Sequence, residues 1–380
     1  MIDRRPPKVA LVHDWLTGMR GGEAVLEAIA EIYPDAPIHT LIAFPETLSP
    51  GLRARRLVTT WMQRLPRVKE KYRHYLPLMP FAIESLDLSD YDLIVSSSHC
   101  VAKGVRKREG AFHACYIHAP MRYMWDRFED YFSPSKAGWL TRTAARILRP
   151  WFQRWDRRSS LGVDLFIANS GFIAAQVERI YQKPSQVLHP FASLSRFLSR
   201  PRKADDFYLM VGAFAPYKRV DLAIEVFNRM GLPLWIVGGG QEESRLRAIA
   251  GPTIRFLGSA DDATVADLYS RCRAFVFPGV EDFGITPLEA MASGAPVIAF
   301  AEGGALETVT PETGVFFAEQ TIDALQAAIL KVESPGFQAG SMERESACRQ
   351  RASHFEREAF KSSFAAKVEA GRRTLPSPRS

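Results

Sequence analysis

The feature that most constrains the fold is a regular alternation of short apolar runs with amphipathic helical segments. The runs expected to form strands are 9–15, 92–97, 114–119, 164–170, 207–214, 233–239, 253–259, 273–279, 296–300 and 314–317. Strands that alternate with helices predict parallel sheets with helices on both faces. The runs are almost unbroken by polar residues, as expected for strands that are buried on both sides.

The stretch 189–207 divides these strands into two series. It contains prolines, serines and charged residues with little periodicity, which is typical of a linker. We therefore predict an α/β protein with two Rossmann-like domains, whose parallel sheets face each other across a cleft. The predicted domains are 1–195 and 196–350. Residues 351–380 are expected to form a helix that crosses back to the first domain and ends in a frayed tail.

Composition excludes several classes of protein. The 380 residues include four scattered cysteines without a CxxC pair, which indicates a reduced cytoplasmic protein with neither a zinc site nor a disulfide framework. No run approaches the ~20 apolar residues that span a bilayer. The first apolar run is interrupted by His13 and Asp14, which argues against a signal peptide.

The net charge is +7, and basic residues gather at 53–56, 67–75 and 142–158. Together these clusters favour an anionic partner, namely nucleic acid, an anionic membrane or a diphosphate substrate. For any single cluster, ordinary solvated surface is the favoured explanation. Segment 59–84 mixes aromatic residues, prolines and bases. It is predicted either to lie on an anionic membrane leaflet or to pack as a helical insertion with a basic rim.

Glycines mark the turns between several strands and the helices that follow them. A glycine lets the backbone approach a ligand closely, and a helix N-terminus favours phosphate. In open parallel sheets, ligands bind beyond the carboxyl ends of the strands. These turns therefore predict a phosphate-bearing ligand; their glycines are Gly21, Gly22, Gly279, Gly284, Gly303 and Gly304.

Two glutamates in the 279–289 stretch have different explanations from sequence alone. Residues Thr286 to Glu289 fit a capping box, with Thr at the N-cap, Pro at N1 and Glu at N3, which would give Glu289 a structural role. Glu281 lies in the preceding loop. Its carboxylate could accept hydrogen bonds from sugar hydroxyls, or it could be an ordinary exposed acid.

Residues 279–309, GVEDFGITPLEAMASGAPVIAFAEGGALETV, resemble the signature of retaining GT-B glycosyltransferases of the E-x7-E type, the group 1 or family 4 enzymes. The resemblance covers nearly the whole chain. Residues 13–23 are similar to the family's first glycine loop, 116–126 to the segment with its active-site histidine, and 211–228 to the start of its donor domain. The subgroup most similar to this chain is that of bacterial polysaccharide mannosyltransferases.

The resemblance implies roles for individual residues. The implied catalytic residues are Glu281, which would bind hydroxyls of the donor sugar, His118, which would contact the same sugar, and Lys218, which would neutralise the diphosphate. Glu289 would hold the ribose. The full implied set for donor binding is Gly21, Gly22, Arg219, Phe283, Gly284, Ile285 and Glu289. One departure is Ala213, where many members have an arginine whose charge Arg219 could replace.

The implied reaction moves a hexose from a nucleotide sugar to a glycan or a polyprenyl-diphosphate-linked sugar, with retention of configuration, in polysaccharide or O-antigen synthesis. GDP-mannose is the expected donor and a UDP-hexose the alternative; no other cofactor and no nucleic-acid partner is expected. The acidic pairs at 205–206 and 261–262 fall in linker and helix-start positions, so metal-independent transfer is predicted. The expected location is cytoplasmic, with peripheral contact at the inner face of the plasma membrane.

Two other classes of function remain open from the sequence. A GT-B-like epimerase would use the same nucleotide sugar without an acceptor. A non-catalytic scaffold could use the basic clusters to hold nucleic acid, although it would leave Glu281 and Glu289 unexplained. His13, His99 and His189 are interpreted as structural.

Overall fold

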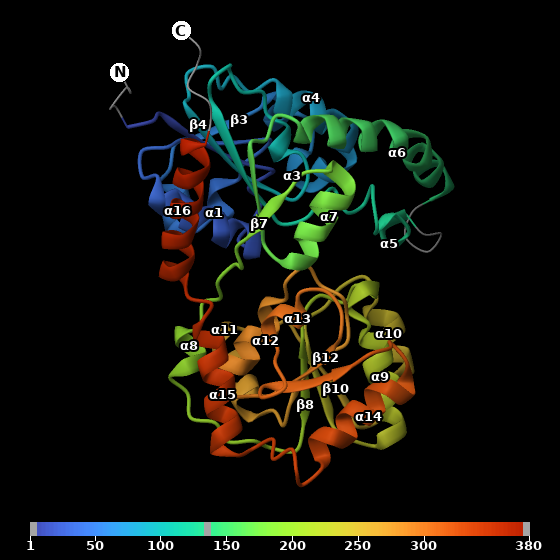
Figure 1. Cartoon of the computed structure of the whole chain (residues 1–380). Helices are drawn as coiled ribbons and strands as arrows, with labels where there is room; N and C mark the ends of the chain where they lie inside the picture. Colours follow the sequence, from blue (N-terminus) through green and yellow to red (C-terminus); the bar gives the residue numbers. More distant parts are fainter. Residues whose placement is uncertain (1–5, 133–137, 375–380) are drawn as a thin grey trace. The chain divides into compact units, whose positions relative to one another are not determined.

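The computed structural model describes residues 6–132 and 138–374, which form two compact units (Figure 1). Unit 1 contains the chain up to residue 189 together with the C-terminal residues from 358, and unit 2 contains residues 190–357. The predicted boundaries lay after residues 195 and 350. Each unit is built on one parallel sheet with helices packed against it, so the expected α/β class with two Rossmann-like domains is confirmed.

The sheet of unit 1 has seven strands in the order β3-β2-β1-β4-β5-β6-β7, and all of its pairings are parallel. The strand order reverses between β1 and β4, where the carboxyl ends of neighbouring strands open a natural ligand site. The strands are β1 (Val9–His13), β2 (Ile38–Thr40), β3 (Leu57–Thr59), β4 (Leu93–Ser98), β5 (Phe112–Ile117), β6 (Leu165–Ala168) and β7 (Ser185–Val187).

Helices cover both faces of this sheet. One face packs against the helices of segment 59–84 and against two longer helices further along the chain. The helices of unit 1 before the linker are α1 (Gly21–Ile32), η1 (Pro45–Thr47), α2 (Pro50–Arg53), η2 (Trp61–Arg64), α3 (Val68–Lys71), η3 (Tyr72–Leu78), α4 (Met79–Glu84), η4 (Ala102–Gly104), α5 (Phe128–Phe132), α6 (Trp139–Ser160) and α7 (Gly171–Tyr181).

The C-terminal helix α16 (Arg357–Arg373) belongs almost entirely to unit 1, far from its neighbours in sequence. Phe360 and Phe364 lie with their ring centroids 5.5 and 6.2 Å from that of Tyr116 on β5. Lys361 forms an ion pair with Glu31 of α1 at 3.0 Å. Burial of these aromatic side chains holds the helix on the sheet.

The sheet of unit 2 has six parallel strands in the order β10-β9-β8-β11-β12-β13. Its strand order reverses between β8 and β11, which places the switch point of this sheet at their carboxyl ends. The strands are β8 (Tyr208–Val211), β9 (Leu234–Val237), β10 (Ile254–Gly258), β11 (Phe275–Phe277), β12 (Val297–Phe300) and β13 (Gly314–Phe317).

Successive residues of the central strands face opposite sides of this sheet, as the two-residue period of a strand requires. Leu209, Phe275 and Val297 pack on one side with α8, α11, α12 and α15, whereas Met210 and Ile298 pack on the other with α9, α10 and α14 (Figure 1). The helices are α8 (Ser195–Leu198), η5 (Pro216–Lys218), α9 (Val220–Met230), α10 (Glu243–Ile249), α11 (Asp262–Arg271), α12 (Ile285–Ala292), α13 (Ala305–Thr308), α14 (Ile322–Glu333) and α15 (Met342–Ser353).

Side-chain caps fix the start of several of these helices. Ser170, Asp261, Thr321 and Ser341 each accept a hydrogen bond from a backbone N–H in the first turn of α7, α11, α14 and α15 respectively. A cap of this kind stabilises a helix by about 1 kcal/mol. The loops before these helices are therefore held in place by local sequence.

Candidate functional site

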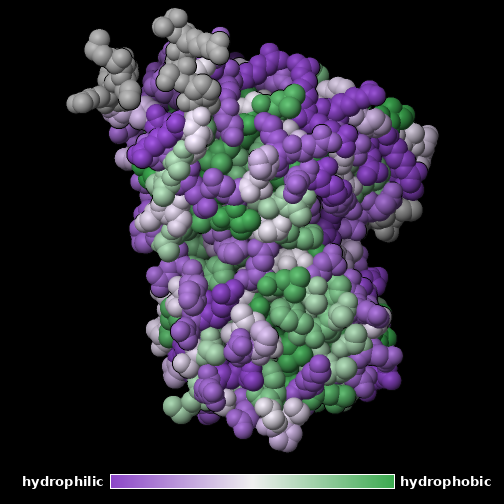
Figure 2. Space-filling model, viewed as in Figure 1, coloured by the Kyte–Doolittle hydropathy of each residue, from purple (hydrophilic) through white to green (hydrophobic). Residues whose placement is uncertain are grey.

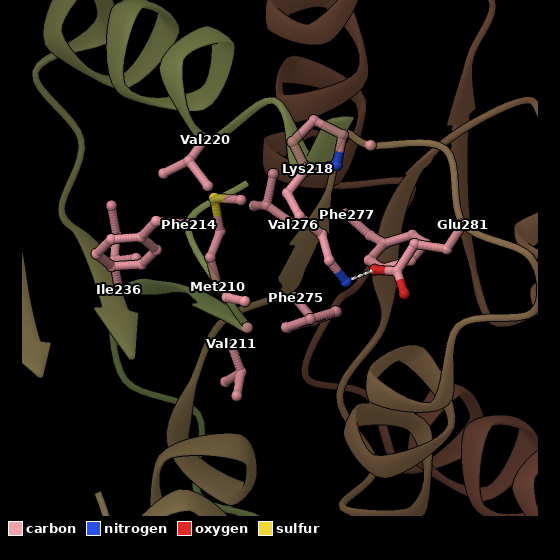
Figure 3. Close-up of a pocket in the computed structure, with 14 residues that line it drawn as sticks. Met210, Val211, Phe214, Lys218, Val220, Ile236, Phe275, Val276, Phe277 and Glu281 are labelled. Atoms are coloured by element: carbon pink, nitrogen blue, oxygen red, sulfur yellow. Dashed lines mark hydrogen bonds and ion pairs between the residues drawn. The ribbon is translucent and has the colours of Figure 1, made fainter. Parts of the chain in front are cut away.

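Two loops meet at the switch point of unit 2. Lys218 is the last residue of η5, after β8, and Glu281 lies in the loop between β11 and α12. The Nζ of Lys218 donates to Oε1 of Glu281 and forms an ion pair with it (Figure 3). Their side chains are only 17% and 19% exposed. The structure thus brings together two of the three residues predicted to be catalytic.

Glycines make this close approach of the loops possible. A Cβ on Gly279 would lie 2.4 Å from the carbonyl oxygen of Tyr217 and 2.6 Å from the Cα of Lys218. A Cβ on Gly303 would lie 2.5 Å from the carbonyl oxygen of Glu281. The same carbonyl accepts a hydrogen bond from the N–H of Gly304 at 2.9 Å. A side chain at Gly279 or Gly303 would therefore displace one of the two charged residues.

A pocket beside the ion pair is lined mainly by apolar side chains, and Lys218 and Glu281 are its charged lining residues (Figure 3). Ala213 also lines it, at the position where the resemblance leads one to expect arginine. Arg219 does not line this pocket. Its guanidinium donates hydrogen bonds to Asp221 at 3.3 Å and to Gln320 at 3.3 Å. Among the described residues that line the pocket, Lys218 is thus the only cation.

The N-terminus of α12 differs from the predicted capping box. The helix begins at Ile285 and its N-cap is Gly284, with φ of +85°. Thr286 is thus inside the helix, and its Oγ1 is buried without a hydrogen-bond partner in the described part of the chain. The N–H groups of Ile285 and Thr286 have no acceptor within the helix. Phe283 is buried, and its ring centroid lies 5.7 Å from that of Phe355.

Glu289 does not take part in a capping box. Its carboxylate accepts a hydrogen bond from the hydroxyl of Tyr269 at 3.2 Å and contacts Arg196 at 3.5 Å. Burial raises the pKa of Glu289 to about 7, although the positive charge of Arg196 opposes this shift. A buried carboxylate with a raised pKa is typical of a functional site.

In unit 1, Gly22 and His118 lie together at the carboxyl edge of the sheet. Gly21 and Gly22 are the first two residues of α1, and His118 follows β5 directly. A Cβ on Gly22 would lie 3.8 Å from Nε2 of His118. The ring of His118 is hydrogen-bonded to Ser97 Oγ at 2.9 Å. Burial, together with the neighbouring histidines, lowers the pKa of His118 well below 6.5, so it is a neutral hydrogen-bonding group at pH 7.

Two further histidines lie beside His118, although the sequence suggested a structural role for them. The ring of His99 lies 5.9 Å from that of His13 and 6.5 Å from that of His118, between centroids. Both ring nitrogens of His13 are buried and have no hydrogen-bond partner within residues 6–132 and 138–374. Burial lowers the pKa of His99 to about 4, against the effect of Asp14. Each of the three histidines ends a strand or directly follows one. This shared position at the carboxyl ends of strands could have predicted from the sequence that they lie together.

The family model that matches this chain is described as "Glycosyl transferases group 1", and it covers residues 194–354. That range contains Lys218, Glu281 and Glu289 and is nearly the whole of unit 2. Unit 2 is a group 1 glycosyltransferase domain. The predicted family is therefore confirmed for residues 194–354.

Curated relatives of this chain include mannosyltransferases. The chain is 31% identical over 211 residues to "GDP-mannose-dependent alpha-mannosyltransferase" of Mycolicibacterium smegmatis, which covers 55% of this chain and 48% of the relative. It is 32% identical over 164 residues to "O-antigen chain mannosyltransferase C" of Escherichia coli, covering 39% and 44%. The chain thus matches about half of the length of these relatives.

The whole chain resembles the solved structure of a sucrose-phosphate synthase. Sucrose-phosphate synthase from Thermosynechococcus elongatus superimposes with a TM-score of 0.69 at 19% identity, covering 96% of this chain and 98% of that one. At this identity the similarity establishes the fold, and the predicted GT-B fold of the glycosyltransferase is confirmed.

Several residues that surround the predicted ones could not be predicted from the sequence. Tyr269 and Arg196 contact Glu289 from α11 and α8, and Ser97 contacts His118 from β4. No motif in the surrounding sequence marks any of these three residues as part of a site. Only the order of the strands in the sheets brings their elements together.

Proposed function

We propose that this glycosyltransferase transfers a mannosyl residue from GDP-mannose to a hydroxyl of a glycan or a polyprenyl-diphosphate-linked sugar, with retention of anomeric configuration. The observation that carries the proposal is the meeting of Lys218 and Glu281 at the switch point of unit 2, beside the N-terminus of α12. A nucleotide sugar has a diphosphate and sugar hydroxyls, and this site offers a cation and a carboxylate for them.

Departure of the nucleoside diphosphate builds negative charge on the β-phosphate. Lys218 and the N–H groups of Ile285 and Thr286 are donors suited to that charge. The buried Oγ1 of Thr286, which has no partner in the described residues, is a third donor at the same helix end. Removal of one such donor typically lowers the rate ~10²–10³-fold.

The carboxylate of Glu281 is proposed to bind hydroxyls of the transferred sugar. As the bond from C1 to the phosphate oxygen breaks, the sugar gains oxocarbenium character, which a nearby carboxylate stabilises. The bond from C1 to the acceptor oxygen forms on the same face, and the proton of the acceptor hydroxyl passes to the departing phosphate. The role of His118 toward the sugar stays a prediction of the resemblance.

Glu289 is proposed to bind the ribose of the donor. Its carboxylate already accepts a hydrogen bond from Tyr269, and ribose hydroxyls would supply the further donors that a buried carboxylate needs. Binding of the ribose would then favour the charged form of Glu289.

Metal-independent transfer is part of the proposal. The acids that could imitate a metal-binding pair have other partners: Asp205 binds Arg271 at 2.6 Å and Asp206 binds Arg273 at 3.2 Å. Asp261 caps α11, and Asp262 forms an ion pair with Arg196. Lys218 and the helix N-terminus are proposed to neutralise the diphosphate instead.

The choice of mannose rests on the names of the curated relatives, and a UDP-hexose remains the alternative donor. The test is a thermal-shift screen of GDP- and UDP-sugars, followed by turnover with a polyprenyl-diphosphate-linked acceptor and NMR of the product anomer. Stabilisation by GDP-mannose and an α-linked mannosyl product would support the proposal. Nucleotide diphosphate release that does not depend on the acceptor, or an inverted product, would refute it.

A further inference from the structure

The long helix α6 of unit 1 exposes large apolar side chains. Leu140 is 65% exposed, Ile147 72% and Trp151 37%, and Trp139 at the start of the helix is 72% exposed. Single exposed apolar residues are common, but a contiguous set on one helix marks an interaction surface.

These side chains share one face of the helix. Leu140, Ala144, Ile147 and Trp151 follow the spacing i, i+4, i+7, i+11, and all are exposed, so they form a stripe about 16 Å long. We call this stripe the α6 face. The opposite side of the helix packs into unit 1 through buried residues, among them Phe152. The α6 face is therefore not the side that stabilises the fold.

The α6 face is held rigidly on the domain. Lys103 of η4 forms a fully buried ion pair with Asp156, whose carboxylate also accepts hydrogen bonds from Trp125 at 2.7 Å and Tyr181 at 2.8 Å. Trp155 donates to Glu84 of α4 at 2.6 Å. These contacts fix both the rotation of α6 and its position beside α4.

Helix α4 extends the apolar surface. The ring of Phe81, which is 59% exposed, stacks on Trp151 with 5.7 Å between centroids and 25° between planes. Figure 1 shows α4 and α6 at the same end of unit 1. The exposed aromatic surface thus comes from two helices.

The charges on α6 are strongly asymmetric. The helix contains six arginines, and its single acid, Asp156, is buried. Arg146 is exposed and lies 4.0 Å from Glu129. Arg154 and Arg158 continue the line of the stripe beyond Trp151. All solvent-facing charge on this helix is therefore positive.

We propose that the α6 face and Phe81 dock on an anionic phospholipid bilayer. Exposed leucine, isoleucine and tryptophan insert into the boundary of headgroups and acyl chains, and arginines beside them bind anionic headgroups. Nucleic acid would place arginine rather than Leu140 and Ile147 at the centre of the contact. No helix in the described residues is long and apolar enough to cross a membrane. The inference does not depend on the proposed reaction.

The test is co-sedimentation of the full chain with vesicles of phosphatidylcholine, alone or mixed with phosphatidylglycerol. We expect binding to the mixed vesicles that weakens with salt. The double variant Leu140→Ser/Ile147→Ser should lower the partition coefficient at least tenfold, since each substitution removes apolar burial. Arg154→Gln/Arg158→Gln should weaken binding to mixed vesicles by a similar factor.

The matched control is Leu257→Ser/Leu330→Ser, which changes leucines of unit 2 that are 40% and 53% exposed. It should bind vesicles like the native chain. Equal binding of the α6 variant and the native chain would overturn the proposal. So would a shift from dimer to monomer in the α6 variant without loss of vesicle binding, or binding of single-stranded DNA that the arginine variant alone abolishes.

Discussion

Lys218 and Glu281 form an ion pair across 63 residues of sequence, between the loops that follow β8 and β11. Each side chain is less than one-fifth exposed, so a ligand that reaches one of them must meet the other. In the proposed reaction Lys218 binds phosphate and Glu281 binds sugar. The ion pair would then hold both groups in place before the donor arrives.

This arrangement predicts different effects of two substitutions on the binding of GDP without its sugar. Lys218→Met removes the cation that lines the pocket, and a lost charge-assisted hydrogen bond of about 1.5–3 kcal/mol corresponds to roughly 10–100-fold weaker binding. Glu281→Gln releases Lys218 from its carboxylate partner and should leave GDP binding unchanged or tighter. Isothermal titration calorimetry measures both.

Lys331→Met, an exposed lysine on α14, is the control for loss of a positive charge. It should bind GDP like the native chain. Unaltered GDP binding by Lys218→Met would remove Lys218 from the phosphate site.

The raised pKa of Glu289 predicts that nucleotide binding depends on pH. If ribose hydroxyls stabilise the charged carboxylate, affinity rises as pH increases toward about 7 and levels off above it. Because the diphosphate also titrates, the informative quantity is the difference between the native chain and Glu289→Gln. Their affinities should diverge as the pH rises, and parallel profiles would contradict the assignment.

The same shift predicts the pH dependence of stability. The pKa of Glu289 is higher in the folded chain, about 7, than its ordinary value of 4.5, so the folded state binds more protons between these values. Stability is therefore lost as pH rises through this window, by up to about 3 kcal/mol. Urea unfolding at several pH values should show a flatter profile for Glu289→Gln, and an identical profile would show that the carboxylate is not buried in solution.

Gly279→Ala tests whether the loops must touch. The new Cβ would overlap the backbone of Tyr217 and Lys218, and overpacking of this kind costs about 1–3 kcal/mol. We expect both a lower melting temperature and a loss of turnover. Gly336→Ala is the matched control, since nothing lies within 4 Å of its Cβ position. Native turnover of Gly279→Ala would show that the loop geometry is not required.

The proposed use of Lys218 and the α12 N-terminus in place of a metal ion predicts full turnover in excess EDTA. Initial rates of GDP release with acceptor, before and after dialysis against EDTA, measure this directly. Activity that falls and returns on addition of magnesium would contradict it.

The sequence predicted the long buried strands well, because each is a continuous apolar run. It missed β2, β3 and β7, which have three residues each. Strand β7 contains the polar Gln186, and its Val187 is 37% exposed, so this strand lacks an apolar pattern. Segment 59–84 was left between two interpretations, and it packs as short helices that bury Met62 and Tyr72. Its contact with a membrane stays a prediction.

The parts of the site that belong to a local sequence motif could be predicted. Contacts between residues far apart in the sequence could not, because they depend on the topology of the sheet. The turn around Glu281 is readable from its glycines, but the pairing with Lys218 depends on β8 and β11 being neighbours in the sheet. The capping box failed because Gly284 adopts a positive φ and starts the helix two residues before Thr286 would. A glycine adopts a positive φ at little energetic cost, so Gly284 and not Thr286 is the N-cap.

The proposed role of Glu281 is tested most directly by the turnover of Glu281→Gln with a saturating donor and acceptor, beside Glu319→Gln as an exposed control. We predict at least a hundredfold loss of turnover for Glu281→Gln, with a native-like melting temperature and retained GDP binding, and no loss for the control. Turnover by Glu281→Gln at the native rate would contradict the claim that this carboxylate serves the transferred sugar.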